Sequence, residues 1–196
     1  MEPVNVFRDV IPTNGPTQRV SAVGVDMRDW PESYRRILQG NDGSPMAASW
    51  TPLPAAFVYD LEVAGAGLIA VDLPRMVGFV FLLRPAALGL LSERLSPYGE
   101  FLPIECDEDE LVGFHCTNVI DALDMERSNV MRIDGEDRVY FFLYDVNFRA
   151  GTIGDNEVFC VPEDPGVVFF SESFVDWFST LGLTGVGWWL EAEVEP

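Results

Sequence analysis

The sequence contains no lysine, a single histidine and only three cysteines among its 196 residues. Without lysine, the chain cannot form a phosphate-binding loop of the GxxxxGK[ST] type, nor can it be a Schiff-base enzyme, a pyridoxal-phosphate enzyme or a protein kinase. The cysteines, Cys106, Cys116 and Cys160, are odd in number and form no CxxC pair. We therefore expect reduced, mostly buried thiols and no disulfide framework.

The sequence also lacks features of secreted and membrane-spanning proteins. Its first residues, MEPVNVFRDVIP, show no basic region followed by an apolar run, which a secretory signal peptide requires. Its longest apolar runs, such as residues 77–83, are far shorter than the roughly 20 residues that span a bilayer. We expect a cytoplasmic protein that does not contact membranes.

Positive charge is scarce, because 12 arginines face 32 acidic residues for a formal net charge of −20. Residues 1–100 hold 11 acids and 8 arginines, a net of −3, whereas residues 101–196 hold 21 acids and 4 arginines, a net of −17. Such a charge distribution repels nucleic acids and anionic lipids and attracts basic partners. Solubility, or codon usage that favours arginine over lysine, would explain the same composition without a partner.

Hydrophobic residues make up 48% of the chain, including 14 Phe and 5 Trp, which is enough for a folded core and suits a single domain over residues 1–196. The pattern predicts an α+β fold, with a mixed, largely antiparallel sheet and about three short helices. Pro31, Pro85 and Gly182 mark helix boundaries, and Asp134-Gly135 marks a hairpin turn. The predicted helices are 31–38, 85–95 and 171–182, and the predicted strands are 20–25, 57–63, 68–73, 78–83, 101–105, 111–117, 130–133, 138–145, 157–161, 167–170 and 185–194.

A catalytic or metal site is conceivable at Asp121 and Asp124. If residues 118–127 are helical, the two carboxylates lie one turn apart on one face, as a divalent metal or an acid/base pair would need. Any solvated helix face has the same pattern. We favour a structural role, in which Asn118, Asp121, Asp124 and Ser128 cap and brace a turn. A small carboxylate or metal-dependent enzyme remains the alternative.

Other candidate sites are weaker, and we expect no metal and no cofactor. His115 and Cys116 are adjacent in a predicted strand, so their side chains point to opposite faces and cannot easily share a metal. A nucleophilic pair of His115 with Cys106 or Cys160 is conceivable, but a partly buried strand histidine is the simpler interpretation. Trp188 and Trp189 also face opposite sides of a strand. We therefore expect at least one ring in the core, and make no prediction for the other.

Four segments occur together in one order: residues 90–105, 115–128, 157–163 and 167–188. As a set they resemble immunity-protein family eleven of bacterial polymorphic toxin systems, formerly a domain of unknown function. A mid-domain motif of that family is matched by Asn118, Val119, Asp121, Ala122, Leu123, Asp124, Glu126 and Ser128. Its closing motif is matched by Ser171, Glu172, Phe174, Gly182, Leu183, Thr184 and Gly185.

The resemblance covers roughly residues 75–196, which suggests a family core at 75–196 and a variable N-terminal lobe at 1–74. One departure is Phe170, which stands where a valine is usual; a second is the missing lysines. The resemblance implies a non-enzymatic protein that binds and neutralises a cognate protein toxin. It does not indicate the oligomeric state, and a scaffold or regulatory protein without a toxin partner remains possible as an alternative.

Charge adds a prediction about the partner. A basic, nuclease-like toxin carries a positive cleft for phosphates, and an acidic inhibitor could fill it and accelerate association. Acids are densest at two predicted turns, and we expect these turns to contribute the partner-binding surface. The residues are Asp107, Glu108, Asp109, Glu110, Asp134, Glu136 and Asp137.

Overall fold

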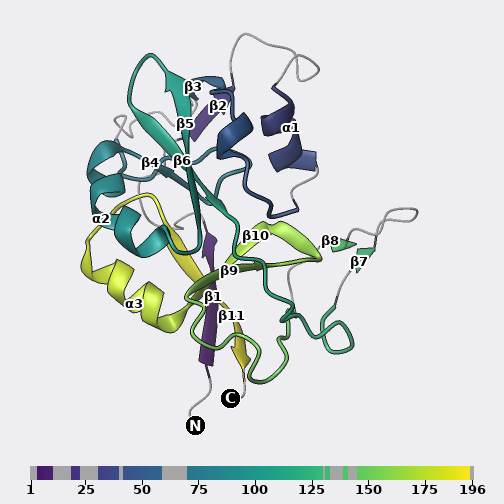
Figure 1. The fold of residues 1–196 in the computed structure, drawn as a ribbon. Coiled ribbons are helices and arrows are strands. Elements are labelled where there is room, and N and C mark those ends of the chain that lie inside the picture. The colour runs from purple at the N-terminus through teal and green to yellow at the C-terminus, as the bar shows by residue number, and fades with distance from the viewer. Residues whose placement is uncertain are drawn as a thin grey trace.

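The computed structural model describes residues 4–10, 19–22, 31–39, 42–58, 70–129, 131–132, 139–140 and 145–194. Two sheets carry the fold of this part of the chain (Figure 1). The first is antiparallel in the order β11-β1-β10-β9, and consists of β1 (Val4–Val10), β9 (Val158–Val161), β10 (Asp164–Ser171) and β11 (Gly187–Val194).

The second sheet is mixed and has the order β2-β3-β5-β6-β4. Its strands are β2 (Arg19–Ala22), β3 (Pro54–Val58), β4 (Phe81–Leu83), β5 (Gly99–Cys106) and β6 (Leu111–Cys116), and of their pairings β3–β5 is parallel. A separate antiparallel pair joins β7 (Met131–Arg132) to β8 (Val139–Tyr140). The predicted hairpin is confirmed in this pairing, although its turn lies outside the described residues.

Three α-helices occur in the described residues: α1 (Glu32–Gln39), α2 (Pro85–Leu95) and α3 (Glu172–Thr180). A short 3-10 helix, Ala47–Ser49, follows α1. Local signals explain why these segments are helical. Pro85 occupies the first turn of α2, and the Ser171 hydroxyl caps α3 by accepting a hydrogen bond from the backbone N–H of Phe174 at 3.2 Å. The α+β prediction is confirmed, with the strands divided between two main sheets.

Two strand predictions are wrong in the described residues. Residues 70–73 of the predicted strand 68–73 form no strand, and of the predicted strand 78–83 only Phe81–Leu83 is extended. Gly78 has a φ of 95° and belongs to a turn, which breaks the apolar run that suggested a longer strand.

One strand of the structure, Val4–Val10, is not predicted from the sequence. β1 lies between β10 and β11 in the first sheet. Its sequence, VNVFRDV, lacks clean alternation because both of its faces are covered: Val6 packs on one side and Phe7 on the other. Its charged residues are compensated by partners distant in sequence, since Arg8 pairs with Glu191 and Asp9 with Arg75.

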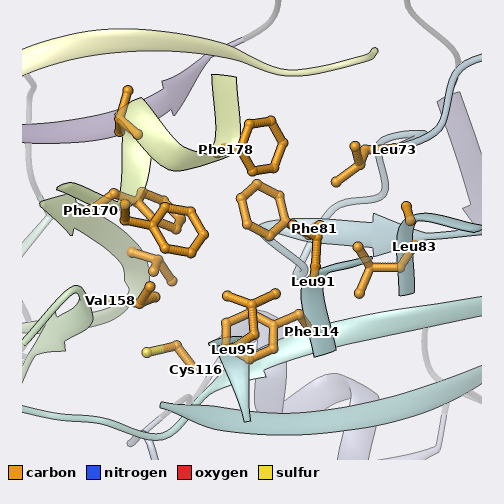
Figure 2. Packing of buried hydrophobic residues seen from close by; sticks show 14 of the residues in the cluster. Leu73, Phe81, Leu83, Leu91, Leu95, Phe114, Cys116, Val158, Phe170 and Phe178 are labelled. Carbon is orange, nitrogen blue, oxygen red and sulfur yellow. The ribbon is translucent and has the colours of Figure 1, made fainter. Parts of the chain in front are cut away.

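The largest hydrophobic cluster of the described residues joins the two sheets to α2 and α3 (Figure 2). These two helices lie next to each other (Figure 1). Its members include Leu91 and Leu95 of α2, Phe178 of α3, Phe114 of β6 and Phe170 of β10. A second cluster packs α1 against the mixed sheet, and a third covers the opposite face of the antiparallel sheet with residues of the 120–125 and 146–153 segments. Each face of the antiparallel sheet therefore packs against a hydrophobic cluster.

Cys116 and Cys160 are buried and Cys106 is half-buried, and all three are free, as predicted. Trp188 packs against the large cluster, whereas Trp189 is 59% exposed, so the two rings face opposite sides of β11 as expected. Among the described residues, no helix has the length and apolar character needed to cross a bilayer.

Candidate functional site

The segment from Asn118 to Ser128 is not helical, so the premise that placed Asp121 and Asp124 on one helical face is wrong. Instead, the chain runs alongside other segments and makes isolated bridges, from Val119 to Cys160 and from Leu123 to Phe148. Ala122 and Leu123 are fully buried in the third cluster. The apolar residues of the motif thus anchor an irregular segment to the sheet.

Asn118 fixes the start of this segment to β9. Its side-chain amide donates hydrogen bonds of 2.9 Å to the Asn156 side-chain oxygen and to the Val158 carbonyl. Its own carbonyl accepts from the backbone N–H of Cys160 at 3.0 Å. The hydrogen-bonding groups of Asn118 and of the β9 backbone are therefore paired with one another.

Asp124 and Ser128 hold a turn at the other end of the segment. One carboxylate oxygen of Asp124 accepts backbone N–H bonds of 3.1 Å from both Glu126 and Arg127. The Ser128 hydroxyl donates to the Asn147 carbonyl at 3.1 Å and accepts from the Asn147 backbone N–H at 2.8 Å. The turn is thus closed from within and attached to the neighbouring chain.

Asp121 has a different environment, because its side chain is 76% exposed and forms a 2.7 Å ion pair with Arg149. Arg149 also donates to the carbonyls of Leu123 and Asp121, so the guanidinium braces the same loop. Each of the two aspartates therefore has its own partner. Within the described residues, His, Cys, Asp and Glu form no group of three or more that could hold a metal.

His115, 3% exposed, lies in β6 beside the half-buried carboxylate of Glu100. Its Nδ1 is 3.0 Å from Glu100 Oε1, and the two Glu100 oxygens accept backbone N–H bonds from Met46 at 2.6 Å and Ala47 at 3.0 Å. Glu100 therefore caps the 3-10 helix and holds His115 in place. This geometry supports a packing role for the single histidine, next to Glu100.

The structure places the acidic residues 107–110 in the turn between β5 and β6. Two of them contact the protein itself: Asp109 pairs with Arg84, and Glu108 accepts a 3.2 Å bond from the backbone N–H of Phe57. Asp107 and Glu110 are exposed, and within the described part of the chain they form no ion pair or side-chain hydrogen bond. The other predicted acids, Asp134, Glu136 and Asp137, lie outside the described residues.

The closing motif holds the segment around Asp72 in place. The Asp72 carboxylate accepts from the Thr184 backbone N–H at 2.9 Å and from the Thr184 hydroxyl at 2.7 Å. In return, the Thr184 hydroxyl accepts from the Asp72 backbone N–H at 3.1 Å, and the Thr184 carbonyl accepts from Leu73 N–H at 3.0 Å. Residues 112 positions apart thus form one reciprocal contact.

Because of this contact, we expect part of the free energy of unfolding to depend on pH. The Thr184 hydroxyl, more than any other group, holds the pKa of Asp72 below its ordinary value of 3.8. A lowered folded-state pKa adds stability above the unfolded-state pKa, and this stability disappears as the pH falls through the folded-state value. We expect Asp72→Asn to lose about 1–2 kcal/mol at neutral pH, since the bonds to the carboxylate are charge-assisted.

Urea unfolding of the wild type and Asp72→Asn between pH 7 and pH 2.5 measures the contribution of the Asp72 carboxylate to the free energy of unfolding. The two free energies of unfolding should converge below about pH 4. A gap that stays constant across this range would show that the charge of Asp72 contributes nothing.

Sequence reasoning missed one set of functional candidates. Arg8, Arg19 and Arg75 line one cavity, although they are far apart in the chain. No local spacing marks them, because β1 was not predicted and the neighbourhood of Arg19 and Arg75 is created by tertiary contacts. The only available signal was the concentration of arginine in the first half, where 8 of the 12 lie.

Comparison with known proteins finds a similarity in the second half of the chain. A search of curated proteins finds no match. A sequence model of the Immunity protein family (Imm11) matches residues 114–193. This range contains the Asn118–Ser128 segment, the antiparallel strands β9 and β10, all but the last residue of β11, and Thr184. The resemblance inferred from the sequence is confirmed over residues 114–193, which match the model of this family of immunity proteins.

Proposed function

We propose that the protein is a cytoplasmic, non-enzymatic immunity protein that binds and neutralises a cognate bacterial toxin. The family match over residues 114–193 carries the proposal. Membership of an immunity family implies a toxin as the partner. The motif residues Asn118, Asp121, Asp124 and Ser128 fit a structural role in this proposal, because each bonds to neighbouring chain segments.

The alternative of a carboxylate or metal-dependent enzyme gains no support from the geometry. Asp121 is paired with Arg149, and Asp124 is occupied by two backbone N–H groups. A catalytic carboxylate pair would instead need both side chains to converge on one reacting atom.

We further propose that the toxin is basic and nuclease-like, and that acidic turns of this protein face it. The net charge of −20 and the exposed carboxylates of Asp107 and Glu110, which pair with no described residue, support this proposal. Asp109, held by Arg84, and Glu108, bonded to the Phe57 backbone, fix the shape of the turn. Asp134, Glu136 and Asp137 are proposed for the same surface on acid density in the sequence alone.

Reversing two charges in the turn should slow toxin binding. We expect Asp107→Arg with Glu110→Arg to reduce the association rate on the order of tenfold at low ionic strength, because long-range attraction accelerates encounter. The reduction should shrink at high ionic strength, where exposed charges are screened. Stopped-flow or surface-based kinetics with the cognate toxin at two salt concentrations measure both effects.

A matched control reverses two exposed acids on the helices, Glu93→Arg on α2 and Asp176→Arg on α3. It changes the net charge equally, so only a local role for the turn predicts a larger effect of the turn variant. Equal association rates for the two variants, or an unchanged rate in the turn variant, would refute the proposed surface.

A further inference from the structure

A cavity of about 510 Å³ lies where β1 and β10 meet the segment before β4. Its lining combines three guanidinium groups and one carboxylate with an apolar wall. We call it the arginine cavity, and its residues are Arg8, Asp9, Arg19, Arg75, Met76, Val77, Gly78, Phe79, Val80, Gly166, Val167 and Val168.

The fold brings the three arginines together from three elements. Arg8 lies in β1, opposite Phe169 of β10. Arg19 begins β2, and an isolated parallel bridge pairs its backbone with that of Arg75. A quarter of the 12 arginines of a strongly acidic chain thus line one cavity.

Nearby carboxylates neutralise these guanidinium groups only in part. Arg75 forms a 2.7 Å ion pair with Asp9, and Arg8 lies 3.4 Å from Glu191. Two buried nitrogens, Nε of Arg8 and Nη1 of Arg75, have no hydrogen-bond partner among the described residues, nor do the buried oxygens Oδ2 of Asp9 and Oε2 of Glu191. Arg19 is exposed and has no ion pair with any described residue. Among the described residues, one positive charge of this group therefore exceeds the two carboxylates.

Buried donors without a partner cost stability unless a ligand satisfies them. A guanidinium group matches the planar or tetrahedral oxygens of carboxylates and phosphates better than any other side chain does. Met76, Phe79 and Val168 are buried in the wall, which favours a ligand that also has an apolar part. The rim is accessible, since Val77 is 77% exposed and Gly78 and Gly166 are exposed.

We propose that the arginine cavity binds a small organic oxyanion, which is a carboxylate or phosphate group attached to an apolar body. The oxyanion lies against Arg19 and Arg75, and the apolar body contacts the Met76–Val80 segment. The site is separate from the proposed toxin-binding turn, because none of its lining residues lies between Asp107 and Glu110.

Calorimetric titration of the full chain with four probes tests the ligand class. Phenyl phosphate and benzoate should bind saturably, inorganic phosphate should bind at least about tenfold more weakly because it lacks the apolar body, and benzylamine should not bind. Absence of saturable binding by both aromatic anions, or binding of benzylamine with equal affinity, would overturn the proposal. Equal affinity for inorganic phosphate would overturn the assignment of an apolar subsite.

Single substitutions test the location. Arg19→Gln should weaken phenyl phosphate binding about tenfold or more, because a charged hydrogen bond is lost. This variant should fold normally, since Arg19 is exposed. Arg75→Gln should abolish binding. Because this substitution alone would leave the Asp9 carboxylate without its ion-pair partner, it is combined with Asp9→Asn. Arg127→Gln, an exposed site elsewhere, should bind as the wild type does. Wild-type affinity in Arg19→Gln and in the Arg75→Gln/Asp9→Asn protein would exclude this cavity.

Discussion

Replacing Phe170 by alanine should lower the free energy of unfolding by about 3–5 kcal/mol. Phe170 is fully buried in β10, and its ring lies between elements distant in the sequence (Figure 2). Its centroid is 5.4 Å from Phe81 of β4, 5.2 Å from Phe174 of α3 and 5.0 Å from Trp188 of β11. Alanine would therefore leave a cavity where both sheets and α3 meet.

Valine at the same position is an informative second variant, because valine is usual there in the family that the sequence resembles. Phe170→Val should lose less stability than Phe170→Ala, since it leaves a smaller cavity. Urea unfolding measures both variants, with Leu90→Ala as a control. Leu90 is 49% exposed, so its truncation should change the free energy of unfolding by about 0.5 kcal/mol or less. A loss below about 1 kcal/mol in Phe170→Ala would contradict the assigned core.

Replacing Gly185 by alanine should cost on the order of 3 kcal/mol. Gly185 has a φ of 103°, which L-residues rarely adopt, and an added Cβ would overlap the backbone carbonyl of Leu73. The clash cannot be relieved by a side-chain rotation, because Leu73 also donates its backbone N–H to Thr184. Relief would require breaking the contact between the closing motif and the Asp72 segment.

Gly182 supplies a matched control in the same motif. Its φ is 66°, but an added Cβ would meet nothing within 4 Å. Gly182→Ala should therefore cost only the conformational strain, about 1 kcal/mol. Thermal or urea unfolding of both variants separates the two effects, and equal losses would show that close packing against Leu73 is unimportant.

Elements with local signals were predictable from the sequence. α2 spans Pro85–Leu95 as expected, because a proline begins it and leucines recur on one face. The helix predicted to begin at residue 171 is α3, which begins one residue later, after the cap Ser171. Elements that depend on distant partners were not predictable. β1 carries charges that Glu191 and Arg75 neutralise, and residues 70–73 are shaped by Thr184.

The acidic turn and the arginine cavity differ in the same way, since only the acidic turn has a local signal in the sequence. The position of the acidic turn followed from the strands on either side of it, because β5 and β6 have clear apolar runs. The pairing of Asp109 with Arg84 and the grouping of Arg8, Arg19 and Arg75 depend on tertiary contacts. Family motifs added what periodicity could not, since the Asn118–Ser128 segment is irregular and its bonding has no repeating pattern.

The central claim, that this protein neutralises a toxin, is tested most directly by growth. The product of the neighbouring gene would be produced in a bacterial host alone, with this protein, and with the structurally disrupted Phe170→Ala variant at matched levels. The account predicts that the gene product alone arrests growth, that the wild-type protein restores growth, and that the two proteins purify as a complex. Persistent growth arrest with abundant, folded wild-type protein and no complex would contradict it.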